Sequence, residues 1–105
     1  MKIRLKENNI KLSLTQQELE QFNHDGKVVT TSQLGPSLVQ TLSYSLMKDE
    51  DADEVSATFV ANHIKVFVPV EVAQKWLETD QKSLEGQMPL DEGESLYILV
   101  EKDLQ

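Results

Sequence analysis

The chain has 105 residues, of which 39% are hydrophobic and 27% charged, and it carries no cysteine and a formal net charge of −8 at pH 7. This composition is typical of a single globular domain, and the lack of cysteine excludes disulfides, thiolate metal ligands and cysteine nucleophiles. The negative charge argues against nucleic acid and anionic membrane as partners, and no apolar run reaches the ~20 residues that a membrane-spanning helix needs.

The first residues predict a hairpin followed by a short helix. Residues 2–6 and 10–14 both alternate between polar and apolar side chains, with an Asn-rich turn between them, which is typical of two paired strands. Thr15 and Glu18 have the spacing of a capping box, so a helix is predicted from there to about Phe22. The alternation leaves no continuous apolar segment for a secretory signal, which together with the missing cysteine favours a cytoplasmic location.

The next segments predict two more strands and a loop. Residues 27–33 and 38–47 are rich in β-branched and alternating side chains and are separated by Gly35 and Pro36. The buried face of the second strand is predicted to carry four apolar side chains, those of Leu38, Leu42, Tyr44 and Leu46. The acidic residues 48–54 are too polar to pack and are interpreted as a loop.

The second half repeats the order of the first. Residues 8–22 and 62–76 follow nearly the same plan fifty-four positions apart. We predict strands around 55–59, 64–68, 83–87 and 96–101, and a helix from about Val70 to Leu77 that begins after Pro69 and buries Val72, Ala73, Trp76 and Leu77. The same shift aligns Leu42 with Leu96, Tyr44 with Ile98 and Gln33 with Gln87.

The chain is therefore predicted to be a single domain, 1–105, with pseudo-repeats at 1–48 and 55–102 that are joined by the acidic loop 48–54. Each repeat has the order strand-strand-helix-strand-strand. The alternative is that two unrelated halves resemble each other because hairpin-helix units are common.

Two predicted strands are apolar on both faces, at 66–68 and 96–100. Such runs are typical of strands that are covered on both sides. We expect the helices to supply the second cover, with Phe67, Tyr97 and Leu99 meeting Trp76 and Leu77. The predicted fold class is α+β and mostly antiparallel β, with about eight strands in a curled sheet or barrel and two short helices on one side.

Five basic residues are predicted to point away from the apolar faces of the two hairpins: Lys2, Arg4, Lys6, Lys11 and Lys65. One interpretation is that they protect exposed strand edges from pairing with other chains. The other is an anion-binding face for a phosphorylated ligand or an acidic peptide. The first is favoured, because neither further arginines nor interleaved aromatic residues accompany these side chains.

No catalytic, metal-binding or cofactor-binding residue is predicted. Asp49, Asp51 and Asp53 begin like a calcium-binding loop, but Glu54 replaces its required glycine and Val60 its final glutamate. His24 and His63 are interpreted as surface residues of turns, because their spacing does not predict a shared metal site. There is also no glycine-rich phosphate loop and no recognisable Ser-His-Asp arrangement.

Three segments carry a resemblance to a known family: KIRLKENNIKLSLTQQELEQF, SATFVANHIKVFVPVEVAQKWLETDQKSLEG and LYILVEKDL. With these segments almost the whole chain resembles a family of small uncharacterised bacterial proteins. The resemblance implies a compact bacterial protein of the cytoplasm, and it supplies no activity and no catalytic residues.

These observations favour a small non-enzymatic module, a monomer or homodimer, that binds an unknown protein or a small anionic ligand. A groove or barrel mouth between the halves is one place for a ligand. The alternative function is a small-ligand protein or enzyme that acts on phosphorylated or anionic compounds through the basic hairpin faces. A third hypothesis is an acidic surface that meets a basic partner protein.

Overall fold

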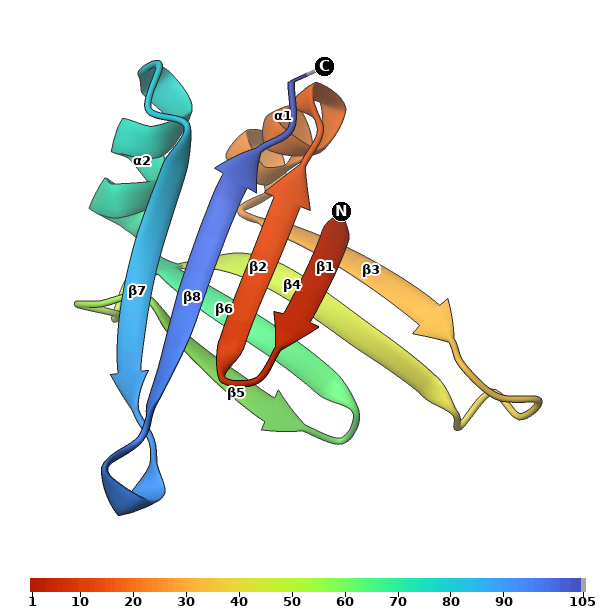
Figure 1. Cartoon of the computed structure of the whole chain (residues 1–105). Helices are drawn as coiled ribbons and strands as arrows, with labels where there is room; N and C mark the ends of the chain where they lie inside the picture. The colour runs from red at the N-terminus through yellow and green to blue at the C-terminus, as the bar shows by residue number, and fades with distance from the viewer. Residues whose placement is uncertain (105) are drawn as a thin grey trace.

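The computed structural model describes residues 1–104, which form eight strands, two α-helices and a short 3-10 turn at Asp91–Gly93 (Figure 1). In chain order they are β1 (Lys2–Lys6), β2 (Asn9–Leu14), α1 (Gln16–Asp25), β3 (Lys27–Gln33), β4 (Thr41–Asp49), β5 (Ser56–Val60), β6 (His63–Pro69), α2 (Val70–Glu78), β7 (Ser83–Pro89) and β8 (Ser95–Lys102). The predicted order strand-strand-helix-strand-strand is confirmed for both halves.

The strands form two separate four-stranded sheets, with the orders β1-β2-β8-β7 and β3-β4-β6-β5. Each sheet combines one hairpin from each half, and the hairpins meet in a central parallel pair, β2 with β8 and β4 with β6. The predicted α+β class with two helices is confirmed, and among the described residues four of the six strand pairings are antiparallel, but the prediction of one curled sheet or barrel was wrong. It failed because each half divides its strands between the two sheets, and a barrel would need the edge strands to pair with one another.

The pairing register has the pseudo-symmetry that the sequence repeat predicts. Ile10 pairs with Ile98 in one sheet, and at a shift of fifty-four Ile64 pairs with Tyr44 in the other. The predicted alignment of Gln33 with Gln87 was wrong. Lys27 pairs with Met47 and Ser83 with Glu101, so β3 and β7 align at a shift of fifty-six. The helix-to-strand connection is longer in the second half, where residues 79–82 stand in place of Gly26 alone.

Local signals determine where the helices begin and end. The predicted capping box is present, because the Glu18 amide donates to Thr15 Oγ1 (3.3 Å) and the Thr15 amide to Glu18 Oε1 (2.9 Å). Helix α1 continues beyond Phe22 to Asp25, where Gly26 adopts a left-handed conformation (φ 76°). Pro69 precedes α2, as predicted, at a position where its missing N–H leaves no bond unmade.

The core lies between the two sheets, and the helices close one end of it. Helix α1 contacts β2 and β3, and α2 contacts β4, β6 and β7, so each helix touches both sheets. Phe22 and Trp76 are completely buried there, together with the strand residues Leu12, Leu14, Leu46, Val66, Val68 and Val100. None of the helices formed by residues 1–104 has the length and apolar character that crossing a membrane requires.

Three detailed expectations about burial were wrong. The helices do not cover the outer faces of the sheets, so Tyr97 is 50% exposed and Phe67 only partly buried. Val72 is exposed on α2. Leu38 is exposed as well, because residues 37–40 form a turn in which the Gln40 amide donates to the Ser37 carbonyl, and β4 begins after it.

Candidate functional site

A groove opens between the two sheets at the end away from the helices. It has a volume of about 480 Å³ and is lined by Leu5, Glu7, Asn9, Ile10, Leu42, Ala57, Thr58, Phe59, Ile64, Met88, Leu90 and Leu96. These residues come from both sheets, and most belong to the strand ends, turns and loops that are farthest from α1 and α2 (Figure 1), whereas Ala57 and Thr58 lie near the start of β5. We call this feature the inter-sheet groove.

The inter-sheet groove lies on the pseudo-symmetry axis of the fold. Three pairs of lining residues are equivalent at a shift of fifty-four: Leu5 with Phe59, Ile10 with Ile64, and Leu42 with Leu96. The groove lies opposite the helix end of the molecule, where the equivalent residues Phe22 and Trp76 meet and fill the space between the sheets. At the groove end, neither α1 nor α2 fills the space between the sheets.

The groove keeps large apolar side chains in contact with solvent. The sequence pattern predicts Leu5 and Phe59 on the inward faces of their strands, and both line the groove, yet they are 54% and 67% exposed. They lie on β1 and β5, which are edge strands of different sheets. Clustered apolar side chains that stay exposed are typical of interaction surfaces.

The two loops at this end of the fold are equivalent but differ in chemistry. The Leu34 amide donates to the Gln40 carbonyl, and at the matching position the Leu90 amide donates to the Glu94 carbonyl, both at 2.8 Å. The β7–β8 loop brings Leu90 to the groove and then exposes Asp91, Glu92 and Glu94. The longer β3–β4 loop instead exposes three apolar side chains, those of Leu34, Leu38 and Val39.

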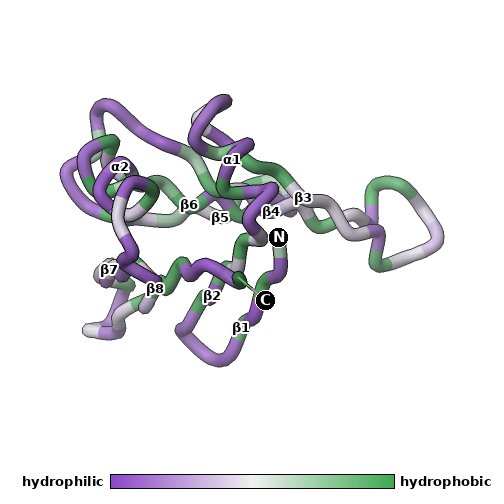
Figure 2. The backbone as a smooth tube through the Cα atoms, turned by 90° about the horizontal axis from the view of Figure 1, so that it is seen from above, coloured by the Kyte–Doolittle hydropathy of each residue, from purple (hydrophilic) through white to green (hydrophobic). Residues whose placement is uncertain are grey.

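The apolar loop is continuous with the groove. Leu42 lines the groove and also a smaller depression that includes Leu34 and Asn62. In Figure 2 the β3–β4 hairpin extends away from the rest of the chain, with hydrophobic colouring at its tip. Leu42 therefore links the groove to a depression at the base of this hairpin, where Leu34 lies beside the polar residues Gln40, Thr41 and Asn62.

The structure brings together four of the five predicted basic residues. Arg4 is the cross-strand partner of Lys11, and with Lys6 they line a depression of about 390 Å³ on the outer face of sheet β1-β2-β8-β7. Tyr97, Leu99 and Glu85 line the same depression. Lys2 lies on the same strand, whereas Lys65 lies in the other sheet, between Ser45 and Thr58.

Two of these basic side chains form ion pairs with carboxylates. Lys11 Nζ lies 3.1 Å from Glu101 Oε1, and Lys2 Nζ lies 3.5 Å from Asp103 Oδ2. Within residues 1–104, no ion pair involves Arg4 or Lys6. Arg4 and Lys6 are therefore the two cations of this face whose charge is not neutralised by a contacting carboxylate.

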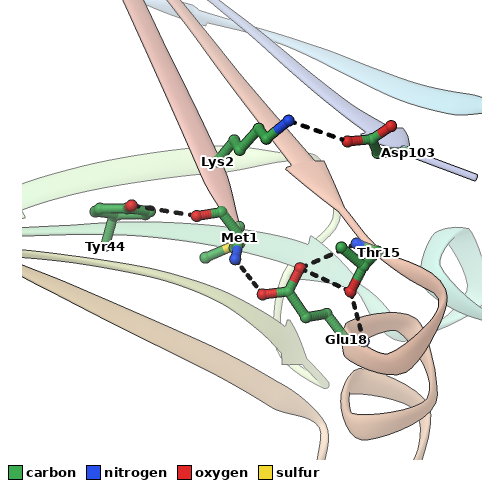
Figure 3. Close-up of polar contacts among 6 residues, drawn as sticks. All are labelled: Met1, Lys2, Thr15, Glu18, Tyr44 and Asp103. Carbon is green, nitrogen blue, oxygen red and sulfur yellow. Dashed lines mark hydrogen bonds and ion pairs between the residues drawn. The ribbon is translucent and has the colours of Figure 1, made fainter. Parts of the chain in front are cut away.

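The start of β1 is fixed by polar contacts (Figure 3). The N-terminal ammonium pairs with the Glu18 carboxylate, and the Tyr44 hydroxyl donates to the Met1 carbonyl (3.2 Å). Burial raises the pKa of Glu18, but hydrogen bonds from the ammonium and from Thr15, together with the ammonium charge, outweigh this and lower the pKa overall. These contacts hold β1 in position, so we interpret them as structural contacts and not as part of a binding site.

The two histidines lie in separate places. His24 is exposed, as predicted, but it lies in the last turn of α1 and not in a turn after it, and its Nδ1 is 2.6 Å from Asp25 Oδ1. His63 begins β6, not a turn, and its Nε2 lies 3.0 Å from Ser45 Oγ. Ser45 is only 1% exposed, so its hydroxyl is not accessible to a substrate. In the described part of the chain, no three His, Asp or Glu side chains gather as metal ligands would.

Comparison with known proteins identifies a family but no activity. The model of a family of unknown function (DUF7009) matches residues 1–105, and the chain belongs to this family. The predicted resemblance to an uncharacterised family is thereby confirmed. No curated protein and no solved structure matches the chain.

Proposed function

For this member of a family of unknown function, we propose the role of a small non-enzymatic binding module of the cytoplasm. Its site is the inter-sheet groove, which takes up apolar side chains of a partner protein. The observation that carries this proposal is the exposure of Leu5 and Phe59, which lie on inward faces of the fold but are left uncovered.

The energetics favour an occupied groove. Complete burial of a Leu or Phe side chain contributes roughly 1.5–3 kcal/mol. Leu5 and Phe59 realise only part of this contribution in the isolated chain, so a partner that covers them gains the remainder. The groove volume of about 480 Å³ lies within the range of 300–1,000 Å³ that is common for binding sites.

The test is selection of binding peptides against the full chain from a random library displayed on phage. Selected peptides are expected to contain large apolar residues, and the variants Leu5→Ser and Phe59→Ser are expected to weaken their binding about tenfold. Val29→Ser is the matched control, because Val29 is an exposed apolar residue of β3 that does not line the groove. Equal binding to the Phe59 and Val29 variants would contradict the proposal.

A second candidate is an anion site in the basic depression, where no carboxylate from residues 1–104 forms an ion pair with Arg4 or Lys6. Its ligand is a phosphorylated or otherwise anionic compound with an apolar part that contacts Tyr97. Titration calorimetry with inorganic polyphosphate tests it. Binding that is lost in Arg4→Ala but kept in Lys65→Ala supports this site, and equal loss in both variants argues for non-specific attraction.

A further inference from the structure

The charged residue that lines the inter-sheet groove is acidic, and so is the loop that follows Leu90. Glu7 is the one charged residue among the described residues that line the groove. Leu90 leads directly into Asp91, Glu92 and Glu94, all of them exposed, and this loop and Glu7 lie at the same end of the sheet (Figure 1). Arg4, Lys6 and Lys11 line a different depression on the opposite face of the sheet, although that depression shares Asn9 and Ile10 with the groove. The groove therefore has a mainly apolar lining, and we call Glu7 and the adjoining β7–β8 loop its acidic rim.

Resting on the proposed function, we propose that the occupant of the groove is a basic and apolar segment of another protein. Its apolar side chains enter the groove between Leu5 and Phe59. Lysine or arginine residues that flank them lie against Glu7 and the acidic β7–β8 loop. This arrangement gives both complementary shape and complementary charge, and the charge selects among partners that have similar apolar residues.

The two sides of the groove differ in chemistry, and this difference determines which way along the groove the bound segment runs. On one side the β7–β8 loop is acidic, and on the other Leu42 leads to a depression that includes Leu34 of the uncharged β3–β4 loop. The basic part of the segment therefore lies beside the β7–β8 loop. Its apolar part extends toward the β3–β4 loop, where Leu38 and Val39 are exposed.

The charges also disfavour two other occupants. A fatty acid or similar anionic amphiphile would place its head group beside Glu7, where no cation from residues 1–104 lines the groove. A second copy of the chain would carry the same net charge of −8, and two such molecules repel each other at low salt. Binding of a basic segment instead makes the net charge of the complex less negative.

The peptides selected on the full chain test the inference, with labelled copies measured by fluorescence anisotropy. We expect them to carry Lys or Arg on one side of their apolar residues and to bind more weakly as salt rises. Glu7→Lys is expected to weaken binding about tenfold at low salt. Glu50→Lys is the matched control, since it changes the charge equally at an exposed residue that directly follows β4 and does not line the groove.

Several results distinguish the two proposals. Selected peptides that are acidic or uncharged, and whose binding requires Phe59 but not Glu7, would overturn this inference and leave the proposed function standing. Binding that does not require Phe59 would overturn both. Oleate binding that Phe59→Ser abolishes, or dimer formation that the same change abolishes in sedimentation experiments, would replace the basic segment by a lipid or by a second copy.

Discussion

Phe22 of α1 and Trp76 of α2 are equivalent residues, and their rings meet edge to face with centroids 6.3 Å apart and planes at 64°. Both are completely buried, so the two helices close the core through a pair of aromatic side chains on the pseudo-symmetry axis. At the other end of this axis, the equivalent residues Leu5 and Phe59 remain exposed. The core is thus closed at one end of the fold, whereas at the other end equivalent apolar side chains stay in contact with solvent.

The same substitution should therefore have different effects at the two ends. Phe22→Ala removes a fully buried ring and is expected to reduce the free energy of unfolding by about 3–5 kcal/mol. Phe59→Ala acts on a side chain that is 67% exposed, and its effect is expected to stay within about 0.5 kcal/mol. Urea unfolding of the full chain measures both. A large reduction of the free energy of unfolding in Phe59→Ala would show that the groove residues are needed for folding.

The aromatic pair has a matching pair of cations. Lys48 Nζ lies 5.6 Å from the Phe22 ring centroid, and at a shift of fifty-four Lys102 Nζ lies 5.7 Å from the Trp76 ring centroid. Lys102 also donates to the Thr79 carbonyl (2.8 Å). Lys102→Met should keep most of the packing but lose both interactions, at a cost of about 1 kcal/mol.

Thermal unfolding measures this cost, with Lys27→Met as the control, because Lys27 is exposed and none of the cation–aromatic contacts involves it. The ring contact is stronger for tryptophan than for phenylalanine. If Lys27→Met were as destabilising as Lys102→Met, the contact with Trp76 would have no specific role.

The elements could be predicted from the sequence because their signals are local. The capping box of Thr15 and Glu18 involves neighbouring residues, and alternation within β2 is enough to place Leu12 and Leu14 on the inward face. The pairing of β2 with β8 could not be predicted, because alternation is the same in parallel and antiparallel strands. The apolar runs at 66–68 and 96–100 were interpreted as covered by helices, whereas they belong to β6 and β8, the central strands of the two sheets.

The candidate site was only partly predictable for the same reason. The pattern correctly directs Leu5 and Phe59 inward, but their exposure depends on how the sheets are arranged at their open end. Alternation also directs Lys11 and Lys65 outward, yet they lie on β2 and β6, which belong to different sheets. A single anion-binding face that includes all five basic residues is therefore not formed.

The lowered pKa of Glu18 predicts a dependence of stability on pH. A carboxyl group whose pKa is lower in the folded than in the unfolded chain contributes stability above its ordinary pKa, and this contribution is lost as the pH falls through the folded-state pKa. The difference in unfolding free energy between wild type and Glu18→Gln should thus be largest at neutral pH and shrink below the ordinary value of 4.5. Chemical denaturation at a series of pH values measures it. A difference that grows toward acid would contradict the assignment.

Gly86 provides a test of how closely the two sheets approach each other. Gly86 lies on β7, and a Cβ atom added there would lie 2.5 Å from the Val55 Cβ. Val55 directly precedes β5, which belongs to the other sheet. Because Val55 is buried and its backbone carbonyl is also near, it has little room to move. Gly86→Ala is expected to cost about 1–3 kcal/mol, while Gln87→Ala on the same strand changes an exposed side chain and costs much less. Equal stability of the two variants in urea unfolding would show that β7 and residue 55 are not in close contact.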